Sequence, residues 1–313
     1  MLKPDDFAAI RDVADPRLSP DGEWVVYTVR TTDLEKDKTA TNLWLAKWDG
    51  SENRALTFGT NNQNHPRWSP DGKSIAFLSS RGDDNDTAQL WLLPREGGEA
   101  AKLTETKGGV DDFAWAPDSQ RLVLVVRDPD PRDVAAKEKE KKTVPPLVID
   151  RFQFKQDIVG YLLNRYSHLA LLEVASRKLE PLTSGANNDL TPVFSPDGAE
   201  IAFVSKRGDD PDRTSNSDLY LIAARAGAAE RPLTTSPEAE TAPAWSPDGK
   251  SVAYIRGGDP KLIGYAARSL AVIPAAGGEA RLLAPNLDRN VLAPRWAADS
   301  SAVLAALEDD GAQ

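Results

Sequence analysis

Short apolar runs alternate with turn-forming residues along most of the chain. The pattern is clearest at residues 67–81, where a Ser-Pro-Asp-Gly turn precedes the run Ile75-Ala76-Phe77-Leu78. Pro70 presets φ for the first turn position and Gly72 can adopt a left-handed conformation, so the stretch predicts two strands joined by a short hairpin. The run is apolar on both faces, which a strand tolerates only where other elements pack on each side. Stacked sheets provide that environment.

Copies of this stretch recur along almost the whole chain. The residue in the place of Ser69 falls at positions 19, 69, 116, 195, 246 and 297, so the intervals are 50, 47, 79, 51 and 51. A period near fifty residues built of short strands is typical of a β-propeller, in which each repeat is one four-stranded blade. The sequence therefore predicts an all-β propeller of four-stranded antiparallel blades.

The repeat also predicts how the chain is divided. We expect a leader at residues 1–12, with a helical turn near residues 6–10, and a propeller over 13–313. About five complete blades precede a partial sixth, in a ring for which seven blades are expected. Because a ring buries its terminal sheets only when it closes, we expect the chain to be cut inside blade six. The predicted strands are 13–18, 24–30, 42–47, 54–57, 65–68, 74–80, 89–93, 100–104, 112–115, 121–127, 191–194, 200–206, 218–223, 230–234, 241–245, 251–256, 269–273, 280–284, 291–296 and 302–307.

The long interval predicts an insertion at about residues 128–167, within blade three. Its proline-rich start cannot be the interior of a strand, and residues 135–142 form a charged, solvated segment. Residues 148–155 and 160–165 predict an extra hairpin, after which 168–172 resumes the third strand of the blade. Insertions on a repeat are normally displayed on one face of the ring, so this is the part of the chain most suited to a separate role.

Composition narrows the classes of partner. A net charge of −10 and a pI near 4.9 argue against nucleic acid or an anionic membrane, which require clustered Lys and Arg. The absence of cysteine excludes disulfides, thiolate metal sites and a cysteine nucleophile. No segment has the apolar length of a signal peptide or membrane span, so we expect a soluble, cytoplasmic protein. A periplasmic protein whose export signal had been removed would give the same pattern.

Candidate chemistry is sparse. The two histidines, His65 and His168, occupy repeat positions, and no Ser-His-Asp set can be assigned to them. The two Gly-Lys-Ser triplets, at residues 72–74 and 249–251, lack the earlier glycine of a phosphate loop and are expected to be hairpin turns. The acidic loops at 81–84 and 207–210 lack the spaced ligands of a calcium loop. We therefore expect no catalytic residue, no metal site and no cofactor in this chain.

Tryptophan and tyrosine recur with the same period. Because Trp68, Trp115, Trp245 and Trp296 each stand just before a turn, they predict packing between blades and not a platform for sugars or bases.

The repeat Trp-Ser-Pro-Asp-Gly-Lys-x-Ile-Ala-Phe resembles the propeller units of Tol-system proteins and of serine peptidases of the prolyl oligopeptidase family. Two features favour the acylaminoacyl- and dipeptidyl-peptidase-like branch of that family: the leader from Pro4 into residues 13–22, and the place of the insertion. A third is Asp150-Arg151-Phe152 ahead of residues 157–161, which is similar to an Arg and Asp-Gly-x-Gly-Tyr segment of that branch. Ile158 stands where the branch has Gly, so this sequence departs from the pattern of the branch there, and the resemblance does not predict the geometry of the loop.

The resemblance implies a non-catalytic cap. In such enzymes a propeller precedes an α/β-hydrolase domain that carries the catalytic Ser, Asp and His, and that domain is absent here. Peptide substrates would then be met through the missing domain, and the parent protein could be a homo-oligomer. Arg151, Lys155, Asp157 and Tyr161 become candidates for contact with substrate or with the missing domain. The favoured alternative for these four residues is a hairpin held by local ion pairs.

Two other functions remain open at this point. A stand-alone, Tol-like propeller would bind protein partners through one face of its ring, without any hydrolase domain. A metal-dependent lactonase propeller would need inward-facing Glu, Asp and Asn ligands, which the sequence does not single out.

Overall fold

The computed structural model describes residues 3, 6, 9–82, 87–131, 146–157, 159–208 and 210–309, with only the backbone of 263 and 264. The chain divides into two compact units. Unit 1 comprises Met1–Leu122 and Glu173–Lys178, and unit 2 comprises Val123–Leu172 and Leu179–Gln313. The described residues form short antiparallel strands with few helical turns.

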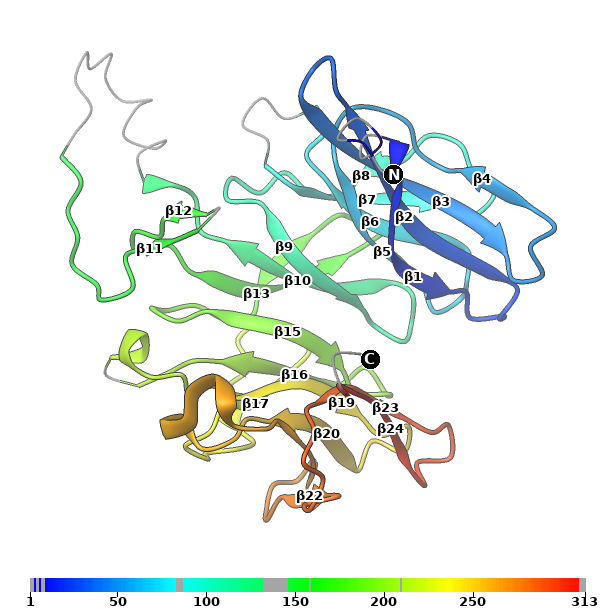
Figure 1. The fold of residues 1–313 in the computed structure, drawn as a ribbon. Coiled ribbons are helices and arrows are strands. Elements are labelled where there is room, and N and C mark those ends of the chain that lie inside the picture. Colours follow the sequence, from blue (N-terminus) through cyan, green and yellow to red (C-terminus); the bar gives the residue numbers. More distant parts are fainter. Residues whose placement is uncertain are drawn as a thin grey trace. The chain divides into compact units, whose positions relative to one another are not determined.

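Unit 1 contains two four-stranded sheets whose strands are paired in chain order (Figure 1). The first consists of β1 (Asp12–Leu18), β2 (Trp24–Asp33), β3 (Lys38–Lys47) and β4 (Asn53–Ala55). The second consists of β5 (Gln63–Trp68), β6 (Ser74–Ser79), β7 (Gln89–Pro94) and β8 (Ala101–Lys102). A third four-stranded sheet is not confined to unit 1. It has the order β14-β13-β10-β9 and consists of β9 (Val110–Trp115), β10 (Arg121–Arg127), β13 (Ser167–Glu173) and β14 (Leu179–Pro181).

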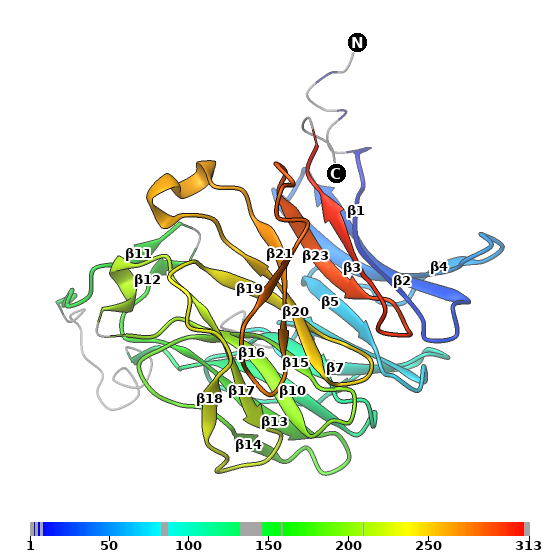
Figure 2. The same cartoon turned by 90° about the horizontal axis from the view of Figure 1, so that it is seen from below.

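Unit 2 contains two more four-stranded sheets with their strands in chain order (Figure 2). One is β15 (Asp189–Phe194), β16 (Glu200–Ser205), β17 (Asp218–Ala223) and β18 (Glu230–Pro232). The next is β19 (Glu240–Trp245), β20 (Ser251–Arg256), β21 (Ser269–Pro274) and β22 (Arg281–Leu283). Two-stranded sheets are formed by β23 (Val291–Trp296) with β24 (Val303–Leu307) and by β11 (Lys155–Gln156) with β12 (Gly160–Tyr161), and η2 (Pro211–Arg213) and η3 (Pro260–Tyr265) are 3₁₀ helices.

The predicted architecture of four-stranded antiparallel sheets is confirmed. The predicted strands agree closely with the observed ones, except that β2 and β3 are longer because their ladder continues to the pair Asp33–Lys38. The predicted leader turn near residues 6–10 lies partly outside the described residues, and the charged segment at 135–142 lies wholly outside them. No helix among the described residues has the length and hydropathy needed to cross a bilayer.

The predicted hairpin of the insertion is wrong in extent. Only Lys155–Gln156 and Gly160–Tyr161 pair as strands, and one further bond joins the Leu162 amide to the Phe154 carbonyl at 2.9 Å. Residues 148–153 do not join this pairing, and the Gln153 amide donates to the Asp212 carboxylate at 3.1 Å instead of to a strand.

The Ser-Pro-Asp-Gly turn has the predicted geometry. Gly72 has φ of 69°, and the Asp71 carboxylate accepts from the Lys73 amide at 3.1 Å. The Ser69 hydroxyl donates to Asp71 at 2.6 Å and accepts from the Ser74 amide at 3.0 Å, which closes the hairpin. The apolar run that follows is buried, with Ile75, Ala76 and Phe77 all 0% exposed.

The repeated tryptophans link successive sheets within each unit. In unit 1 the Trp68 indole donates to the Arg17 carbonyl at 3.0 Å and the Trp115 indole to the Arg67 carbonyl at 3.2 Å. In unit 2 the Trp296 indole donates to the Ala244 carbonyl at 2.9 Å. In each case the acceptor lies two residues before the turn serine position of the preceding copy, so the predicted packing role is accompanied by a directed hydrogen bond.

A bulge recurs in the first strand of the sheets. The pairing of β5 with β6 shifts between Asn64 and Arg67, and four other first strands shift at the same place. The residue four positions before the turn serine position has φ between 48° and 59° in these strands: Asp15, His65, Thr191, Ala242 and Ala293. A bulge redirects the side chain it carries, so His65 owes its orientation to a feature of the repeat.

Candidate functional site

The insertion is fastened to η2 by Arg151. Its guanidinium makes a two-bond pair with Asp212, with Nε–Oδ2 of 2.9 Å and Nη2–Oδ1 of 2.6 Å, and also donates to the Leu163 carbonyl at 3.0 Å. The pair is mostly buried, with side chains 14% and 11% exposed. The bonds to Asp212 raise the pKa of Arg151, and those from Arg151 lower the pKa of Asp212. Arg151 therefore positions the insertion, through a partner 61 residues away.

Large apolar side chains remain exposed on the insertion. We call this surface the insert face and define it as Val148, Ile149, Phe152, Phe154, Val159 and Tyr161. Val148 is 73% exposed and Phe152 62%, whereas apolar side chains of this size are normally buried. Several exposed apolar side chains on one short segment commonly mark a place of interaction.

The four candidates from the sequence fall into different surroundings. Arg151 is committed to Asp212, whereas Lys155 and Tyr161 are directly opposite each other in the β11–β12 ladder, with the ammonium 6.0 Å from the ring centroid. The Phe154 ring stacks on the Tyr161 ring at 6.4 Å. Asp157 is exposed in the turn between the two strands. Lys155 thus lies beside Tyr161 of the insert face, whereas Arg151 is engaged by Asp212 and holds the insertion in place.

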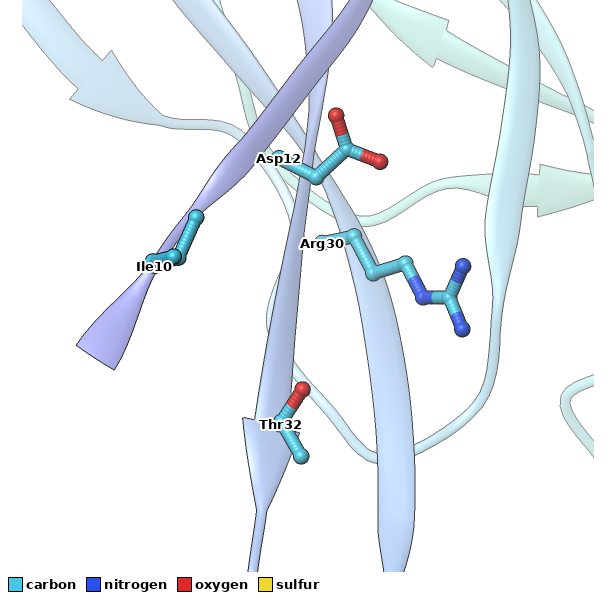
Figure 3. Close-up of a pocket in the computed structure, with 4 residues that line it drawn as sticks. All are labelled: Ile10, Asp12, Arg30 and Thr32. Carbon is cyan, nitrogen blue, oxygen red and sulfur yellow. The ribbon is translucent and has the colours of Figure 1, made fainter. Parts of the chain in front are cut away.

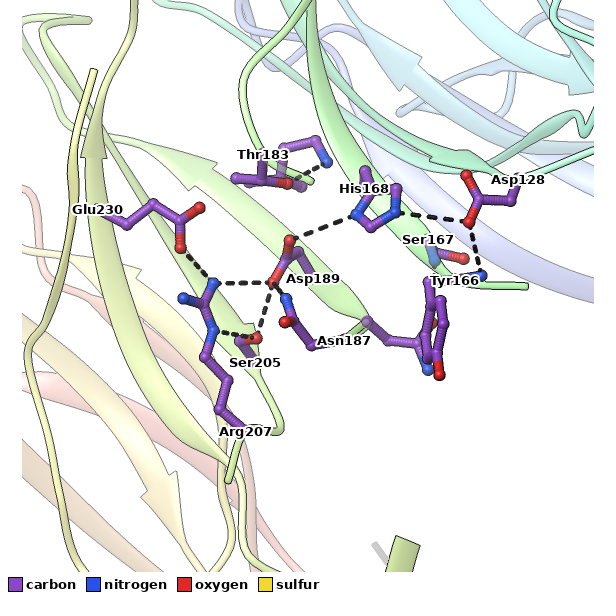
Figure 4. Close-up of polar contacts among 12 residues, drawn as sticks. Asp128, Tyr166, Ser167, His168, Thr183, Asn187, Asp189, Ser205, Arg207 and Glu230 are labelled. Carbon is purple, nitrogen blue, oxygen red and sulfur yellow. Dashed lines mark hydrogen bonds and ion pairs between the residues drawn. The ribbon is translucent and has the colours of Figure 1, made fainter. Parts of the chain in front are cut away.

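A second cluster of polar groups surrounds His168 at the start of β13. Figure 4 shows its ring between the carboxylates of Asp128 and Asp189, at Nε2–Oδ2 3.6 Å and Nδ1–Oδ2 3.8 Å. Asp189, 0% exposed, also accepts from the Ser205 hydroxyl at 2.7 Å and from Arg207 at 3.2 Å. Arg207 bridges onward to Glu230.

The charges in this cluster compensate one another. Asp189, followed by Asp128, raises the pKa of His168 above its ordinary value. Burial alone would raise the pKa of Asp189, but hydrogen bonds and the Arg207 charge outweigh burial and hold that pKa below its ordinary value. The Ser205 hydroxyl donates a hydrogen bond to Asp189 and the residue is 1% exposed, so it is not placed to act as a nucleophile. The polar contacts of this cluster connect β13, β15 and β16 through His168, Asp189 and Ser205.

Sequence reasoning singled out His168 but missed Asp128, Asp189, Arg207 and Asp212. One signal was available, because Asp189 and Arg207 stand six residues before and twelve after Ser195, a spacing that other copies do not fill with an ion pair. Asp212 had no such signal.

His65 is part of a ladder of charges in unit 1. Its Nε2 is 2.8 Å from the Asp112 carboxylate and its Nδ1 is 3.2 Å from the Arg67 guanidinium. Arg67 in turn is 2.8 Å from Asp15, which contacts Arg17 at 2.6 Å. Both ring nitrogens of His65 are thereby engaged with charged neighbours.

A shallow pocket of about 200 Å³ lies in unit 1, lined by Ile10, Asp12, Arg30 and Thr32 (Figure 3). Asp12 and Arg30 face each other across the β1–β2 ladder, so the polar groups of the pocket belong to one strand pair. Over the part of the chain that the structure describes, no three His, Cys, Asp or Glu side chains are grouped as metal ligands.

The chain is similar in sequence to peptidases. No family model matches it. It is 31% identical over 223 residues to the uncharacterized peptidase YuxL of Bacillus subtilis, covering 71% of this chain and 34% of that protein. It is 30% identical over 324 residues to dipeptidyl-peptidase 5 of Porphyromonas gingivalis, covering 96% of this chain and 45% of that protein. The chain therefore spans less than half the length of these curated relatives.

Solved structures agree on the fold. Acylaminoacyl peptidase of Pyrococcus horikoshii superposes with a TM-score of 0.73 at 20% identity, over 97% of this chain and 44% of that chain. The β-propeller domain of the trilobed protease of Pyrococcus furiosus gives a TM-score of 0.65 at 18% identity, over 96% and 80%. The chain is thus a β-propeller homologous to peptidases, with the propeller fold of the prolyl oligopeptidase-family enzymes that its sequence resembles.

Proposed function

We propose that this chain is the non-catalytic propeller of a serine peptidase of the acylaminoacyl or dipeptidyl type, and that it restricts the access of peptides to a separate α/β-hydrolase domain. The observation that carries the proposal is the alignment of 96% of this chain with only 45% of a dipeptidyl-peptidase. More than half of that relative lies outside the aligned part and has room for a catalytic domain.

The insert face is the surface that we assign to peptide contact. Phe152, Phe154 and Tyr161 offer exposed aromatic rings, and Lys155 adds a positive charge beside one of them. Aromatic surface with one adjacent charge suits a peptide that presents an apolar side chain and a carboxylate or carbonyl. The pair of Arg151 with Asp212 supports this surface from behind, because it fixes the backbone that carries Phe152.

The catalytic half of the proposal is tested with the 313-residue chain and acyl-aminoacyl and dipeptidyl chromogenic substrates. We expect no hydrolysis above the buffer rate. Turnover that a serine-directed inhibitor abolishes would overturn the proposal. The gene gives a second measurement, since the coding sequence beyond residue 313 is expected to continue into a Gly-x-Ser-x-Gly segment. A gene that ends after closure of the ring would favour the stand-alone, Tol-like interaction propeller instead.

The access role is tested in the full-length gene product. We expect Phe152→Ser combined with Tyr161→Ser to raise KM for peptides several-fold, with kcat on a minimal chromogenic substrate unchanged. Trp48→Ser is a matched control, because Trp48 is 72% exposed and lies outside the insertion. Equal effects of the two changes on peptide KM would exclude the insert face from substrate contact.

A further inference from the structure

Three polar pairs occupy the same place in the first, third and fourth four-stranded sheets along the chain. Asn42, His168 and Asp218 each precede a leucine whose amide donates to a threonine hydroxyl at 2.8–2.9 Å. Each meets the first strand of the sheet that follows: Gln63 donates to Asn42 at 3.4 Å, and His168 lies 3.8 Å from Asp189. The third pair is Asp218 with Glu240. The Glu240 amide donates to the carbonyl of Ser217, the residue before Asp218, at 2.8 Å, so the two acids lie on adjoining strands. We call this position the slot. It holds a neutral pair in Asn42 and Gln63, a histidine with a carboxylate in His168 and Asp189, and two acids in Asp218 and Glu240.

The two slots of unit 2 differ in their donors. Asp189 pairs with Ser205 across its ladder, and Glu240 pairs with Arg256 at the equivalent position. One oxygen of Asp189, Oδ1, accepts from Ser205 and from Arg207, whereas Oδ2 lies 3.8 Å from the His168 ring and has no hydrogen bond among the described residues. Around Glu240 the corresponding positions hold Arg256, Gly258 and Asp218.

None of these three side chains donates to Glu240 as Ser205 and Arg207 donate to Asp189. The Arg256 guanidinium is turned to Glu238, with Nη2–Oε2 of 2.9 Å, and glycine and aspartate side chains have no proton donor at neutral pH.

Three buried oxygens of this slot have no hydrogen-bond partner among the described residues: Asn216 Oδ1, Asp218 Oδ1 and Glu240 Oε2. Glu240 is 1% exposed, and its other oxygen accepts from the Ser236 hydroxyl at 2.6 Å. The other Asp218 oxygen accepts from the Asn216 amide at 3.3 Å. Unpaired buried acceptors are uncommon in proteins, and two neighbouring carboxylates that each leave one oxygen unpaired are costly.

A proton shared by the Asp218 and Glu240 carboxylates would provide a hydrogen bond for only two of the three unpaired oxygens. Burial, and for Glu240 also the charge of Asp218, raises the pKa of both acids. One proton between two carboxylates joins two oxygens and leaves Asn216 Oδ1 without a partner. A cation that takes oxygen ligands would neutralise both carboxylates and could also use the amide oxygen of Asn216 as a ligand.

We propose that Asn216, Asp218 and Glu240 bind a hard divalent cation, with Ca²⁺ as the best fit. The donors are two carboxylates and one amide carbonyl, and the Ser236 hydroxyl lies beside them. Ca²⁺ takes six to eight oxygen ligands in flexible geometry and can complete its shell with water, whereas Mg²⁺ requires a near-ideal octahedron. The slot has no nitrogen or sulfur ligand for a softer metal. Neither the repeat pattern nor the proposed function predicts this site.

The test compares chelator-treated chain with and without CaCl₂ by thermal unfolding and calorimetric titration. We expect a single Ca²⁺ per chain and, at about one hundred times Kd, a rise in Tm of roughly 5 °C or more. Asp218→Asn with Glu240→Gln should abolish Ca²⁺ binding and leave Tm without Ca²⁺ equal to or above that of the wild type, since the repulsion is gone. Glu279→Gln, an exposed acid of the same sheet, is the matched control and should retain the shift.

Asn216→Ser gives an independent measurement that keeps both charges and should weaken Ca²⁺ binding about tenfold or more. The proposal is overturned if Ca²⁺ neither binds nor shifts Tm of the wild type, or if all variants retain the shift. It is equally overturned if Tm changes with pH through a proton shared by the two acids while Ca²⁺ has no effect.

Discussion

Single residues show how the turns tolerate sequence change. Copies three and six replace the turn serine by Ala116 and Ala297, and lose the hydroxyl that closes the hairpin elsewhere. The same copies carry Ser119 and Ser300 in place of glycine, with φ of 59° and 61°. Each of these serines accepts from an aspartate amide of a neighbouring turn, at 3.0 Å for Asp71 and 3.1 Å for Asp248. The degenerate copies therefore exchange a bond within the turn for one between turns.

His168 should make stability depend on pH. Because its folded pKa is raised by Asp189 and Asp128, the stabilisation is complete below the ordinary pKa and is lost as pH rises through the folded value. We expect His168→Gln to destabilise the chain by about 1–2 kcal/mol more at pH 5.5 than at pH 8.5. Urea unfolding at both pH values measures this difference.

Ser269→Ala provides the control, because Ser269 begins the third strand of its sheet without a titrating group. Its effect should be the same at both pH values. An equal loss at pH 5.5 and 8.5 for His168→Gln would show that the ion pairs do not contribute.

At the scale of elements, the sheets of each unit are joined by buried apolar faces and by indole hydrogen bonds. We expect Trp68→Phe to cost about 1–3 kcal/mol, since it removes the bond to the Arg17 carbonyl together with part of a buried ring. Trp48→Phe is the control and should stay within about 0.5 kcal/mol, because Trp48 is 72% exposed. Similar shifts in the urea midpoint for the two variants would contradict the role given to the indole bond.

The insertion is an element held by one strong pair. We expect Arg151→Gln and Asp212→Asn to show a coupling of about 1–3 kcal/mol in a double-mutant cycle, because the pair is bidentate and largely buried. Either change should also speed chymotrypsin cleavage within residues 146–166 several-fold, as local opening becomes easier.

Lys36→Gln is the comparison for this cycle, since its pair with Asp33 has side chains 66% and 45% exposed. Exposed pairs contribute little, so its effect should be near zero. Unchanged cleavage of the insertion in both Arg151 and Asp212 variants would mean that other contacts hold it.

At the scale of the whole molecule, protection should differ between sheets. The strand β16 is buried over five of its six residues, whereas β24 is exposed over four of its five. We expect β16 amides to exchange with solvent at least a hundredfold more slowly than β24 amides, because buried strands open only in larger unfolding events. Hydrogen exchange followed by mass spectrometry measures both. Comparable rates would show that β24 is covered by contacts that the structure does not contain.

The sequence by itself determined the strands, their order and their turns. The repeat predicted nearly every described strand within a few residues, because strand and turn formation depend on local alternation and on residues such as Pro70 and Gly72. It also predicted an insertion and singled out Lys155 and Tyr161, which are exposed on β11 and β12.

Tertiary structure decided the partners. The pairing of Arg151 with Asp212, the donors around Asp189 and the unpaired oxygens of Asp218 and Glu240 join residues far apart in the chain. Asp189 and Glu240 stand at equivalent repeat positions, yet Asp189 accepts from Ser205 and Arg207 whereas Glu240 accepts from Ser236. That difference arises only where neighbouring sheets meet, since burial and hydrogen bonding depend on the surroundings in space and not on the period of the sequence.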